Sequence, residues 1–364
     1  MQKKLIALAV ASLASTGAFA AFDANIEFDN LYQNRDSVVI DNAGGPNGLG
    51  GVNTAPKGLS QSGRVELNAS GKVGTDMFVA GRASFLAQKS GGVATDDMWF
   101  QLGNSAVDLK LGRFEAADLF PIPRDAYIPI ANYDISKQVA VVTPVFTIDP
   151  VTGVVISTST VATVTDLTAA GAVYRGSFLR GRTGSDVFHG ALTFNVGGGL
   201  SAELGVVASD KSRGNITGFR PVLTYRAGPL MVRGGFESFA LGNSEKASGY
   251  GLTGSYDLGG ITLSANFASA KLNWVDDRKS RTYGLFMNTA MGFAAGYIAS
   301  EDSGGTNSVA LGKFKTSTLY AAYTMPLFDI KGASATAAIA TSDGGGSNNA
   351  EKINGAKVRF NYAF

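Results

Sequence analysis

The chain ends in Gly355-Ala-Lys-Val-Arg-Phe-Asn-Tyr-Ala-Phe364, where apolar and polar side chains alternate. Successive side chains of a β-strand point to opposite faces, so this stretch predicts a strand with one apolar and one polar face. The apolar face carries Ala356, Val358, Phe360, Tyr362 and Phe364, and the polar face carries Lys357, Arg359 and Asn361. Such two-faced strands, ending in aromatic residues, are typical of barrels that face lipid outside and water inside.

The amino terminus has the three parts of a secretory signal peptide. Lys3 and Lys4 form a positive start, residues 5–14 form an apolar segment too short to span a bilayer, and Ala18-Phe-Ala20 is a small-x-small cleavage site. Polar residues follow at once, which disfavours a membrane anchor. We expect residues 1–20 to be a cleaved signal peptide and residues 21–364 to be the mature protein. Loss of the two lysines lowers the formal charge from +2 to 0.

Composition fits an exported barrel. Charged residues make up 16% of the chain, well below the usual quarter, yet no apolar run reaches the ~20 residues of a spanning helix. A barrel resolves this conflict because only alternate residues of each strand need to be apolar. The chain has no cysteine, so disulfides and thiol chemistry are excluded. A near-zero net charge without basic clusters argues against nucleic-acid binding. We expect no cofactor.

The same alternation recurs along the chain between turn signals such as Gly197-Gly-Gly199, and it predicts sixteen strands. Closure of these strands into a barrel leaves no free edge and satisfies every backbone polar group within the bilayer. The sequence therefore predicts one all-β domain, a transmembrane antiparallel barrel. The expected strands are residues 21–32, 64–70, 77–86, 98–102, 107–112, 186–196, 200–209, 219–226, 230–239, 250–256, 261–269, 281–288, 292–298, 317–324, 332–341 and the terminal stretch.

The links between these strands alternate short with long, as in barrels with short periplasmic turns and long external loops. The long polar links are expected at residues 34–62, 209–218, 271–280 and 300–315, and Asp276-Asp-Arg-Lys279 is expected to be a solvated loop tip. The longest irregular stretch covers residues 114–185. Residues 137–148 and 151–164 inside it predict a hairpin, which is either an excursion of the loop or two further barrel strands, making eighteen. We favour sixteen, because residues 154–164 lack a clear lipid-facing side.

With these features the chain resembles the trimeric porins of Gram-negative outer membranes. The resemblance rests on the signal peptide, the sixteen alternating strands, the terminal Phe364 and the long third external link, and it is architectural. Residues 111–120, Leu-Gly-Arg-Phe-Glu-Ala-Ala-Asp-Leu-Phe, stand where such porins leave the fifth strand and fold a loop into the lumen. The segment is also similar, less closely, to the corresponding stretch of sugar-uptake porins. The resemblance implies a homotrimer, contact with outer-membrane lipid and lipopolysaccharide, and an assembly signal at Phe364.

A constriction of this kind works electrostatically, because acidic groups on the inward loop face basic groups on the barrel wall. We expect the acidic residues Glu115, Asp118, Asp125 and Asp134 on the loop, taken as residues 114–185. We expect the basic residues Arg64, Arg82 and Arg359 on the wall, with Lys110 and Arg113 at the base of the loop. Each carboxylate has the alternative of being an ordinary solvated loop residue.

Aromatic residues of the same loop allow two interpretations. Phe120, Tyr127 and Tyr133 could stack on sugar rings in the pore, or they could pack the loop against the wall. Trp99 and Trp274 are expected in the aromatic belt at the membrane interface.

Three classes of function remain. The favoured function is a porin for passive diffusion of small hydrophilic solutes and ions, with a carbohydrate-selective porin as the alternative. A barrel hydrolase would need His189, the one histidine, which is expected on the lumen side; a lone histidine is more often a plain lumen residue, and it makes no metal site. A barrel adhesin acting through its external loops is the third class. We therefore expect no enzymatic activity.

Overall fold

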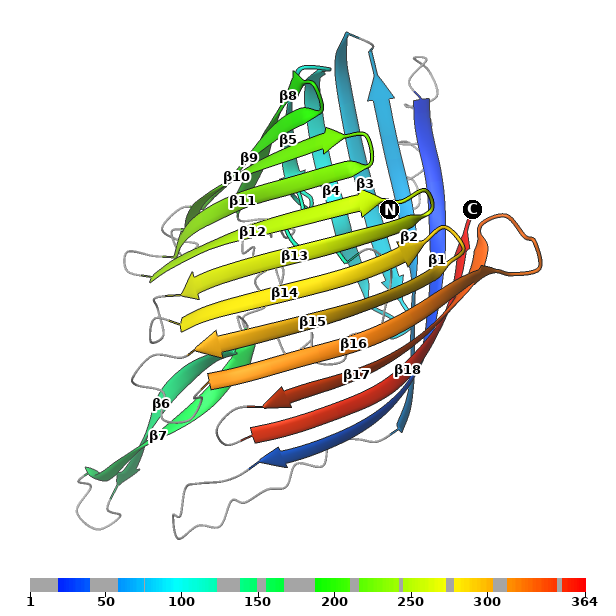
Figure 1. The fold of residues 1–364 in the computed structure, drawn as a ribbon. Helices are drawn as coiled ribbons and strands as arrows, with labels where there is room; N and C mark the ends of the chain where they lie inside the picture. The colour runs from blue at the N-terminus through cyan, green and yellow to red at the C-terminus, as the bar shows by residue number, and fades with distance from the viewer. Residues whose placement is uncertain are drawn as a thin grey trace.

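The computed structural model describes residues 19–39, 58–74, 76–122, 138–148, 155–166, 187–209, 216–241, 245–272, 278–303, 313–345 and 349–364. Sixteen antiparallel strands of these residues form one closed barrel, in the ring order β1-β18-β17-β16-β15-β14-β13-β12-β11-β10-β9-β8-β5-β4-β3-β2 (Figure 1). The prediction of a sixteen-stranded all-β barrel is confirmed. Among the described residues, no helix is long and apolar enough to cross a membrane.

The barrel strands extend beyond the sequence-based limits at many ends. Their bounds are β1 Phe19–Val39, β2 Gly58–Val73, β3 Met77–Gln88, β4 Val93–Asn104, β5 Val107–Arg113, β8 Phe188–Gly197, β9 Leu200–Ala208, β10 Ile216–Ala227, β11 Leu230–Leu241, β12 Glu245–Asp257, β13 Ile261–Leu272, β14 Arg278–Thr289, β15 Phe293–Ser303, β16 Lys313–Pro326, β17 Ala333–Gly345 and β18 Asn349–Ala363. The prediction of a solvated loop tip is wrong for Arg278 and Lys279, which belong to β14. The backbone of Lys279 is paired with that of Lys271 on β13, so the strand continues there although its side chains are polar. Asp276 and Asp277 lie outside the described residues.

The hairpin inside the long link is an excursion, not part of the barrel. Strands β6 (Gln138–Ile148) and β7 (Val155–Asp166) pair with each other in a separate two-stranded sheet. The barrel continues directly from β5 to β8, which pair over residues 107–111 and 190–194. The choice of sixteen strands over eighteen is therefore confirmed.

Closure joins the first and last strands at the end of the barrel that carries both termini (Figure 1). The backbone N–H of Ala24 donates to the Phe364 carbonyl, and the N–H of Phe364 donates to the Ala24 carbonyl, both at 2.9 Å. From there β1 and β18 stay in register as far as Val39 opposite Asn349. The ring of Phe364 is exposed on the outer surface and stacks on Tyr362, with ring centroids 5.2 Å apart.

The alternation expected for the terminal strand is present in β18. Val358, Phe360 and Tyr362 are exposed on the outside, whereas Lys357 is buried and Arg359 forms ion pairs on the inside. The same outward exposure of large apolar side chains occurs around the ring, from Phe100 on β4 to Leu285 on β14. A continuous apolar exterior of this kind is the lipid-facing surface of a transmembrane barrel.

Deletion of Phe364 should weaken the closure of the barrel. The deletion removes one donor and one acceptor of the Ala24 pair, at a cost of about 1–3 kcal/mol for two hydrogen bonds. We expect less folded, heat-modifiable protein on gels and a lower urea midpoint in detergent. Phe364→Tyr keeps the backbone pair and the ring and should behave as the wild type; an unchanged midpoint after the deletion would contradict the assembly role of this residue.

Candidate functional site

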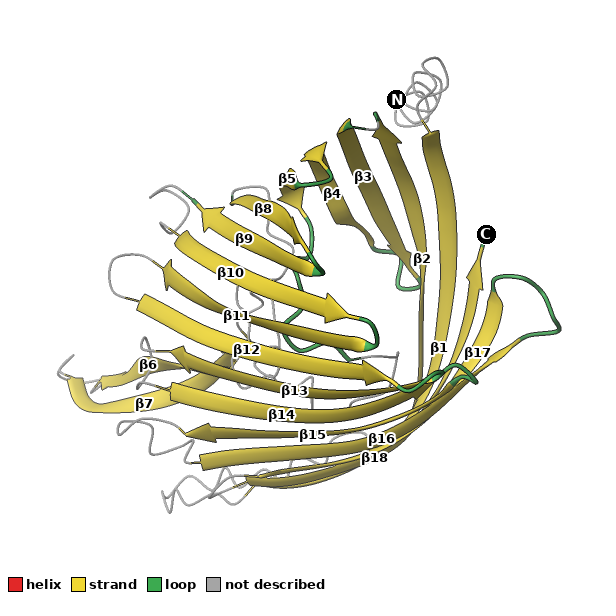
Figure 2. Cartoon of the chain, turned by 45° about the horizontal axis from the view of Figure 1, so that its top comes forward, coloured by secondary structure: helices red, strands yellow, loops and turns green. Residues whose placement is uncertain are grey.

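The inward loop begins at a position that only glycine can occupy without strain. Gly112 has a φ of 119°, and a Cβ added there would lie 2.4 Å from the carbonyl oxygen of Met98. The next residue fixes the base of the loop, because the Nε of Arg113 donates to the carbonyls of Thr95 and Asp96 at 3.2 and 2.9 Å. The backbone after β5 is thereby directed into the barrel (Figure 2).

Residues 114–122 then lie along the inner wall formed by β9 to β13. Side chains on β9, β11, β12 and β13 bind the loop backbone. Ala117 N donates to Glu203 Oε1 at 3.0 Å, Arg233 Nη1 donates to the Asp118 carbonyl at 3.0 Å, Thr253 Oγ1 donates to the Leu119 carbonyl at 2.8 Å, and Asn266 Nδ2 donates to the Pro121 carbonyl at 2.7 Å. Because these contacts are to the backbone, they hold the path of the loop whatever side chains it carries.

A buried ion cluster supports this anchor. The Arg220 side chain is fully buried, donates to the Ala117 carbonyl, and lies 3.4 Å from Glu203 and 3.8 Å from Glu237. Glu237 is also fully buried. A guanidinium can be buried at tolerable cost only where carboxylates and carbonyls surround it. Glu203, Arg220 and Glu237 are functional residues that the sequence analysis missed; their signal is charge at lumen-facing positions of three consecutive strands.

Apolar packing completes the attachment. Leu119 and Phe120 are fully buried, and the ring of Phe120 meets that of Phe286 edge to face at 6.1 Å between centroids. The wall makes room for them, since a Cβ added at Gly251 would lie 2.7 Å from the Leu119 Cβ. Phe120 therefore packs the loop against the wall and does not face the lumen. Of the two interpretations of Phe120, packing of the loop against the wall fits the structure and stacking on solutes does not, because the ring has no exposed surface.

The expected acidic residues of the loop divide into two groups. Glu115 is exposed, whereas Asp118 is half-buried and its Oδ1 accepts the Phe120 N–H at 2.9 Å. Asp118 thus stabilises the turn into the wall as well as carrying charge. Asp125, Asp134, Tyr127 and Tyr133 lie outside the described residues.

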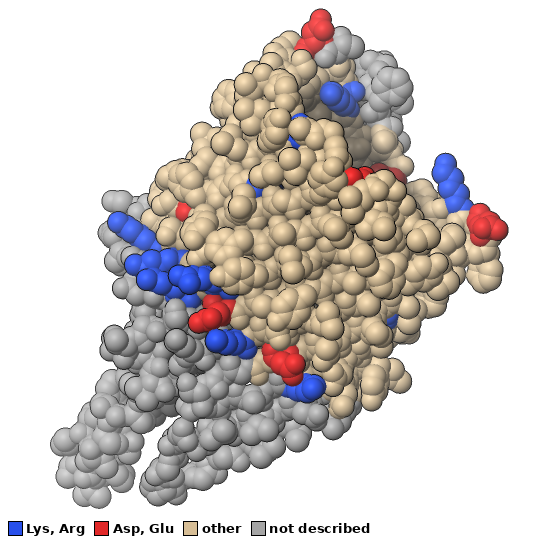
Figure 3. All heavy atoms as spheres, viewed as in Figure 1, with Lys and Arg blue, Asp and Glu red and all other residues tan. Residues whose placement is uncertain are grey.

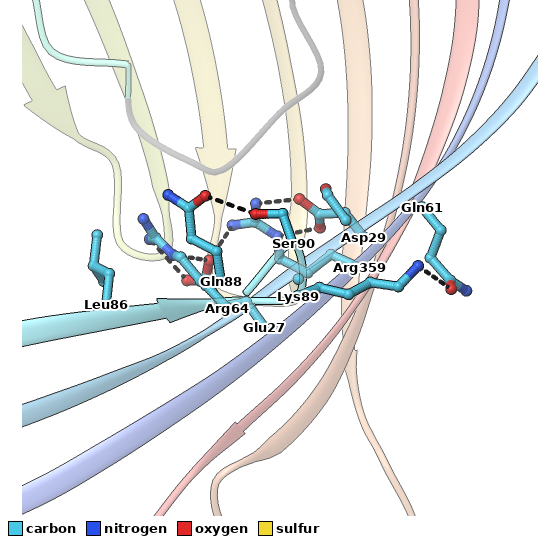
Figure 4. A pocket seen from close by; sticks show the side chains of 11 residues that line it. Glu27, Asp29, Gln61, Arg64, Leu86, Gln88, Lys89, Ser90 and Arg359 are labelled. Carbon is cyan, nitrogen blue, oxygen red and sulfur yellow. Dashed lines mark hydrogen bonds and ion pairs between the residues drawn. The ribbon is translucent and has the colours of Figure 1, made fainter. Parts of the chain in front are cut away.

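The wall formed by β18, β1 and β2 carries two of the expected basic residues, each in a tight ion pair (Figure 4). Arg359 binds Asp29 through two hydrogen bonds of 2.5 and 2.7 Å, and Arg64 binds Glu27 through two of 2.7 and 3.3 Å. Glu27 also lies 3.4 Å from Arg359, so it bridges the two guanidinium groups. Paired bidentate contacts of this type fix the direction of the charged groups.

Arg82 extends the same pattern onto the next strands. Its Nη2 donates to Glu66 at 3.1 Å and to Asn68 at 2.8 Å, and its Nε lies 3.7 Å from Asp97. The three arginines point to the lumen side as expected. The wall is not a basic surface, however, because Glu27, Asp29, Glu66 and Asp97 interleave with them. Four carboxylates for three guanidinium groups make this a mixed wall, which we call the charged wall.

The charged wall and the anchored loop occupy opposite sides of the barrel. In the ring order, β11, whose Arg233 holds the loop, is eight strands from β1 in either direction. A hollow of about 670 Å³ lies along the charged wall, lined by Glu27, Asp29, Arg64, Leu86, Gln88 and Arg359 among others (Figure 4). Charged and amide groups thus border open space on the lumen side.

The base of the loop contains a third group of lumen residues. Lys110 lies over the ring of Trp99 at 4.5 Å and near that of Phe114 at 5.4 Å. The expectation that Trp99 belongs to the interfacial belt is wrong: Met98 and Phe100 face outward, so Trp99 between them faces inward and covers the lysine. Trp274 lies outside the described residues.

His189 is buried beside this group and stacks on Phe114 at 4.1 Å between ring centroids. Neither ring nitrogen has a hydrogen-bond partner in the described structure. The described residues contain no group of three or more potential ligands placed to hold a metal ion. Within the part of the chain that the structure describes, no group is hydrogen-bonded to the ring to take or deliver a proton.

Comparisons with known proteins identify the fold. No protein-family model matches the chain, and no curated protein matches it. Among solved structures, the in-vitro folded OmpT, an outer membrane protein of Vibrio cholerae in its trimer form, has a TM-score of 0.60 at 12% identity, covering 96% of this chain and 100% of that chain. Outer-membrane expressed OmpT of Vibrio cholerae has a TM-score of 0.57 at 10% identity, covering 97% and 99%. A mutant of the Rh. blastica porin has a TM-score of 0.51 at 13% identity, covering 94% and 100%. The chain therefore has the fold of the outer-membrane β-barrels.

Arg220→Met should destabilise the barrel by about 3–5 kcal/mol, because it leaves the buried Glu237 without the guanidinium that balances it. The double variant Arg220→Met with Glu237→Met should lose less than the single variant, as measured by urea unfolding in detergent. Arg226→Met, at an exposed lumen-side position of the same strand, serves as the control and should stay within about 1 kcal/mol of wild type. Additive losses in the double variant would contradict the coupling.

Proposed function

We propose that this protein is a porin, a water-filled channel for passive diffusion of small hydrophilic solutes and ions across the outer membrane. The observation that carries the proposal is the pairing of an inward loop, anchored on β9 to β13, with the charged wall on the other side of the ring. A loop held inside the barrel narrows the lumen, while charged side chains keep it hydrated. Lumen charges of this kind select permeating ions by their field.

Selectivity in this proposal comes from a mixed field. Arg64, Arg82 and Arg359 supply positive charge within the charged wall, and the carboxylates interleaved with them supply negative charge at nearly the same height. Glu115 and Asp118 add carboxylates on the loop, and Lys110 and Arg113 add cations at its base. Since the wall charges are largely balanced, we propose a general channel in which the pore radius dominates and ion preference is weak.

The two other classes of function have less support. A carbohydrate-selective porin would need aromatic rings in the pore, and one of the three expected rings, Phe120, is buried. Catalysis by histidine requires partners within hydrogen-bond reach of the ring. His189 has a buried ring with no such partner in the described structure, so we propose that the protein is not an enzyme.

We also propose that residues 1–20 are removed on export, as their sequence indicates. The pairing of β1 with β18 begins at Asn25 opposite Ala363, beyond the expected cleavage site. A mature chain starting at Ala21 therefore keeps the whole closing ladder. The intact mass of the protein purified from outer membranes checks the start.

A homotrimer is the proposed assembly, and one surface favours it. On the outside of the barrel, a hollow of about 620 Å³ spans β1 and β15 to β18, lined by residues such as Tyr32, Asn34, Ala295, Leu319 and Ile339. A hollow in the lipid-facing wall can be filled by side chains of a second copy of the chain. One solved neighbour is itself a trimer form.

The channel itself is tested by current across a planar bilayer. We expect the wild type to conduct, with a reversal potential near zero in a salt gradient. Neutralising Glu27 and Asp29 together, as Glu27→Gln and Asp29→Asn, should shift the reversal potential towards anions, and Arg359→Gln should shift it towards cations. Asp343→Asn removes an outward-facing carboxylate and should change nothing. Absence of current would contradict the channel. Unshifted reversal potentials would show that the charged wall does not determine ion selectivity.

The assembly is tested by placing a charge in the outer hollow. Ile339→Arg should dissociate the trimer, measured by native mass spectrometry in detergent, because the guanidinium would be buried between subunits without a partner. Leu285→Arg is the matched control: Leu285 is 61% exposed against 63% for Ile339, but it lies on β14 outside the hollow. In the separate subunit both arginines would face lipid, at the same cost of about 2–4 kcal/mol. Equal dissociation of both, or of neither, would contradict this interface.

A further inference from the structure

A buried histidine without a hydrogen-bond partner stands at the base of the inward loop. His189 is 2% exposed on the lumen side of β8, and neither ring nitrogen has a partner in the described structure. Buried polar side chains are hydrogen-bonded in the great majority of cases, so this exception calls for an explanation. A leucine or a phenylalanine would fill the same space without leaving a buried donor and acceptor unpaired.

The ring of His189 packs directly on the first residue of the loop. It lies nearly parallel to the ring of Phe114, with 4.1 Å between the centroids and 11° between the planes. Phe114 is itself buried in a small cluster with Ala116 and Ala191, and Trp99 packs against this cluster. The stacked pair therefore belongs to the joint at which the loop leaves the barrel wall.

Charged side chains surround this joint on every neighbouring element. They are Lys110 on β5, Arg113 and Glu115 at the start of the loop, Glu203 on β9 and Arg220 on β10. The Nζ of Lys110 lies 5.4 Å from the centre of the Phe114 ring, so a charged imidazole stacked on that ring would be a second cation beside it. Glu203 is engaged with Arg220 and with the N–H of Ala117.

A protonated His189 cannot stay in this site. Both nitrogens of an imidazolium are donors, and no described residue accepts a hydrogen bond from either of them. Burial of an ion without partners costs far more than burial of the neutral ring, and attraction to one aromatic face does not replace the lost hydration. Protonation therefore requires the ring to leave its pocket. Because the ring is stacked on Phe114, the base of the loop must then separate from the wall.

The position of His189 determines which solution supplies the proton. On the face of the barrel seen in Figure 3, charged side chains lie mostly near the strand ends, and a broad uncharged surface covers the wall between them. The neighbouring Phe188 points to that outer side and is 55% exposed. His189 is the second residue of β8, at the strand end opposite the termini, which is the external end because the turns at the terminal end are short. Water thus reaches the ring from the lumen near its external mouth.

We propose that His189 is an acid-sensitive switch of the inward loop: the neutral ring holds the base of the loop against the wall, and uptake of one proton from the external medium releases it. The proton binds only the open form, so a fall in pH shifts the population towards that form. An imidazole in water titrates near pH 6.5, so the ratio of open to closed form should rise about 30-fold between about pH 7.5 and pH 5. The switch goes beyond the proposed channel and does not depend on it.

The test measures the exposure of a cysteine at the base of the loop, in a chain that has no native cysteine. Ala116→Cys places a thiol at a position that is 5% exposed, and Glu115→Cys places one at the exposed neighbouring position. Both variants of the full protein in detergent are labelled with a dilute dipyridyl disulfide, so that the rate for the buried thiol follows the open population. Division of the rate for Ala116→Cys by the rate for Glu115→Cys cancels the pH dependence of the reagent.

We expect this ratio of rates to rise about 30-fold from about pH 7.5 to pH 5 when His189 is present. In the His189→Phe background, which keeps the stacking on Phe114 but takes up no proton, the ratio should change less than about twofold. An equal rise in the His189→Phe background would assign the response to other groups and overturn the proposal. A constant ratio with His189 present would overturn it as well.

Two additions keep the result decisive. His189→Leu repeats the comparison if His189→Phe does not give folded protein, as judged by heat-modifiable mobility. The labelling needs no current, so an unresponsive ratio in a conducting protein would overturn the switch and leave the channel standing. In bilayers, the wild-type current should change reversibly over the same pH range while the current of His189→Phe stays constant; a His189→Phe current that follows pH as the wild type does would contradict the switch.

Discussion

Backbone pairing between the first and last strands is the constraint on which the rest of the structure depends. Within a bilayer, an unpaired backbone N–H or carbonyl costs several kcal/mol, so a sheet can cross only if it has no edge. The ladder from Ala24 and Phe364 to Val39 and Asn349 removes the two edges that sixteen strands would otherwise leave. Once the ring is closed, successive side chains point alternately to lipid and to the interior, and charged groups can lie in the lumen.

The interior uses this freedom asymmetrically. One side holds the anchored loop, whose backbone is hydrogen-bonded to side chains of five strands and which has buried apolar side chains beneath it. The other side carries the charged wall, where every arginine is paired with carboxylates on neighbouring strands. The loop is therefore part of the packed structure and not a free lid. Its position is set by Glu203, Arg220 and Glu237 on the wall as much as by its own sequence.

Strand periodicity was sufficient to predict the fold. A period of two, punctuated by glycine turns, gave the strand number, the exclusion of the β6–β7 hairpin from the ring and the lumen-facing side of Arg64, Arg82 and Arg359. The same alternation places Glu27, Asp29 and Glu66 on the lumen-facing side of their strands, together with those arginines. The sequence analysis did not use this observation, although it allows the ion pairs to be predicted. Trp99 was misplaced because an amphipathic ring fits both an interface and a lumen, although its neighbours Met98 and Phe100 settle its side.

The anchor of the loop could not be predicted in the same way. Ala117 and Arg220 are over a hundred residues apart, and only the three-dimensional path of the loop brings them together. The burial of Phe120 likewise depends on the space left by Gly251 and its neighbours on a distant wall. Many strands were also predicted too short. Charged side chains such as Lys279 were taken to mark a loop, although they point outward from backbone that is still paired.

The position of the loop inside the pore is the central claim, and the absence of native cysteine allows it to be tested directly. Glu115→Cys should react with a charged, water-soluble methanethiosulfonate during a single-channel recording, because this side chain is exposed. Each reaction should reduce the current in a discrete step, while Leu119→Cys, buried against the wall, should not react. A Glu115→Cys channel that is modified without any change in current would contradict a loop that lies within the conducting path.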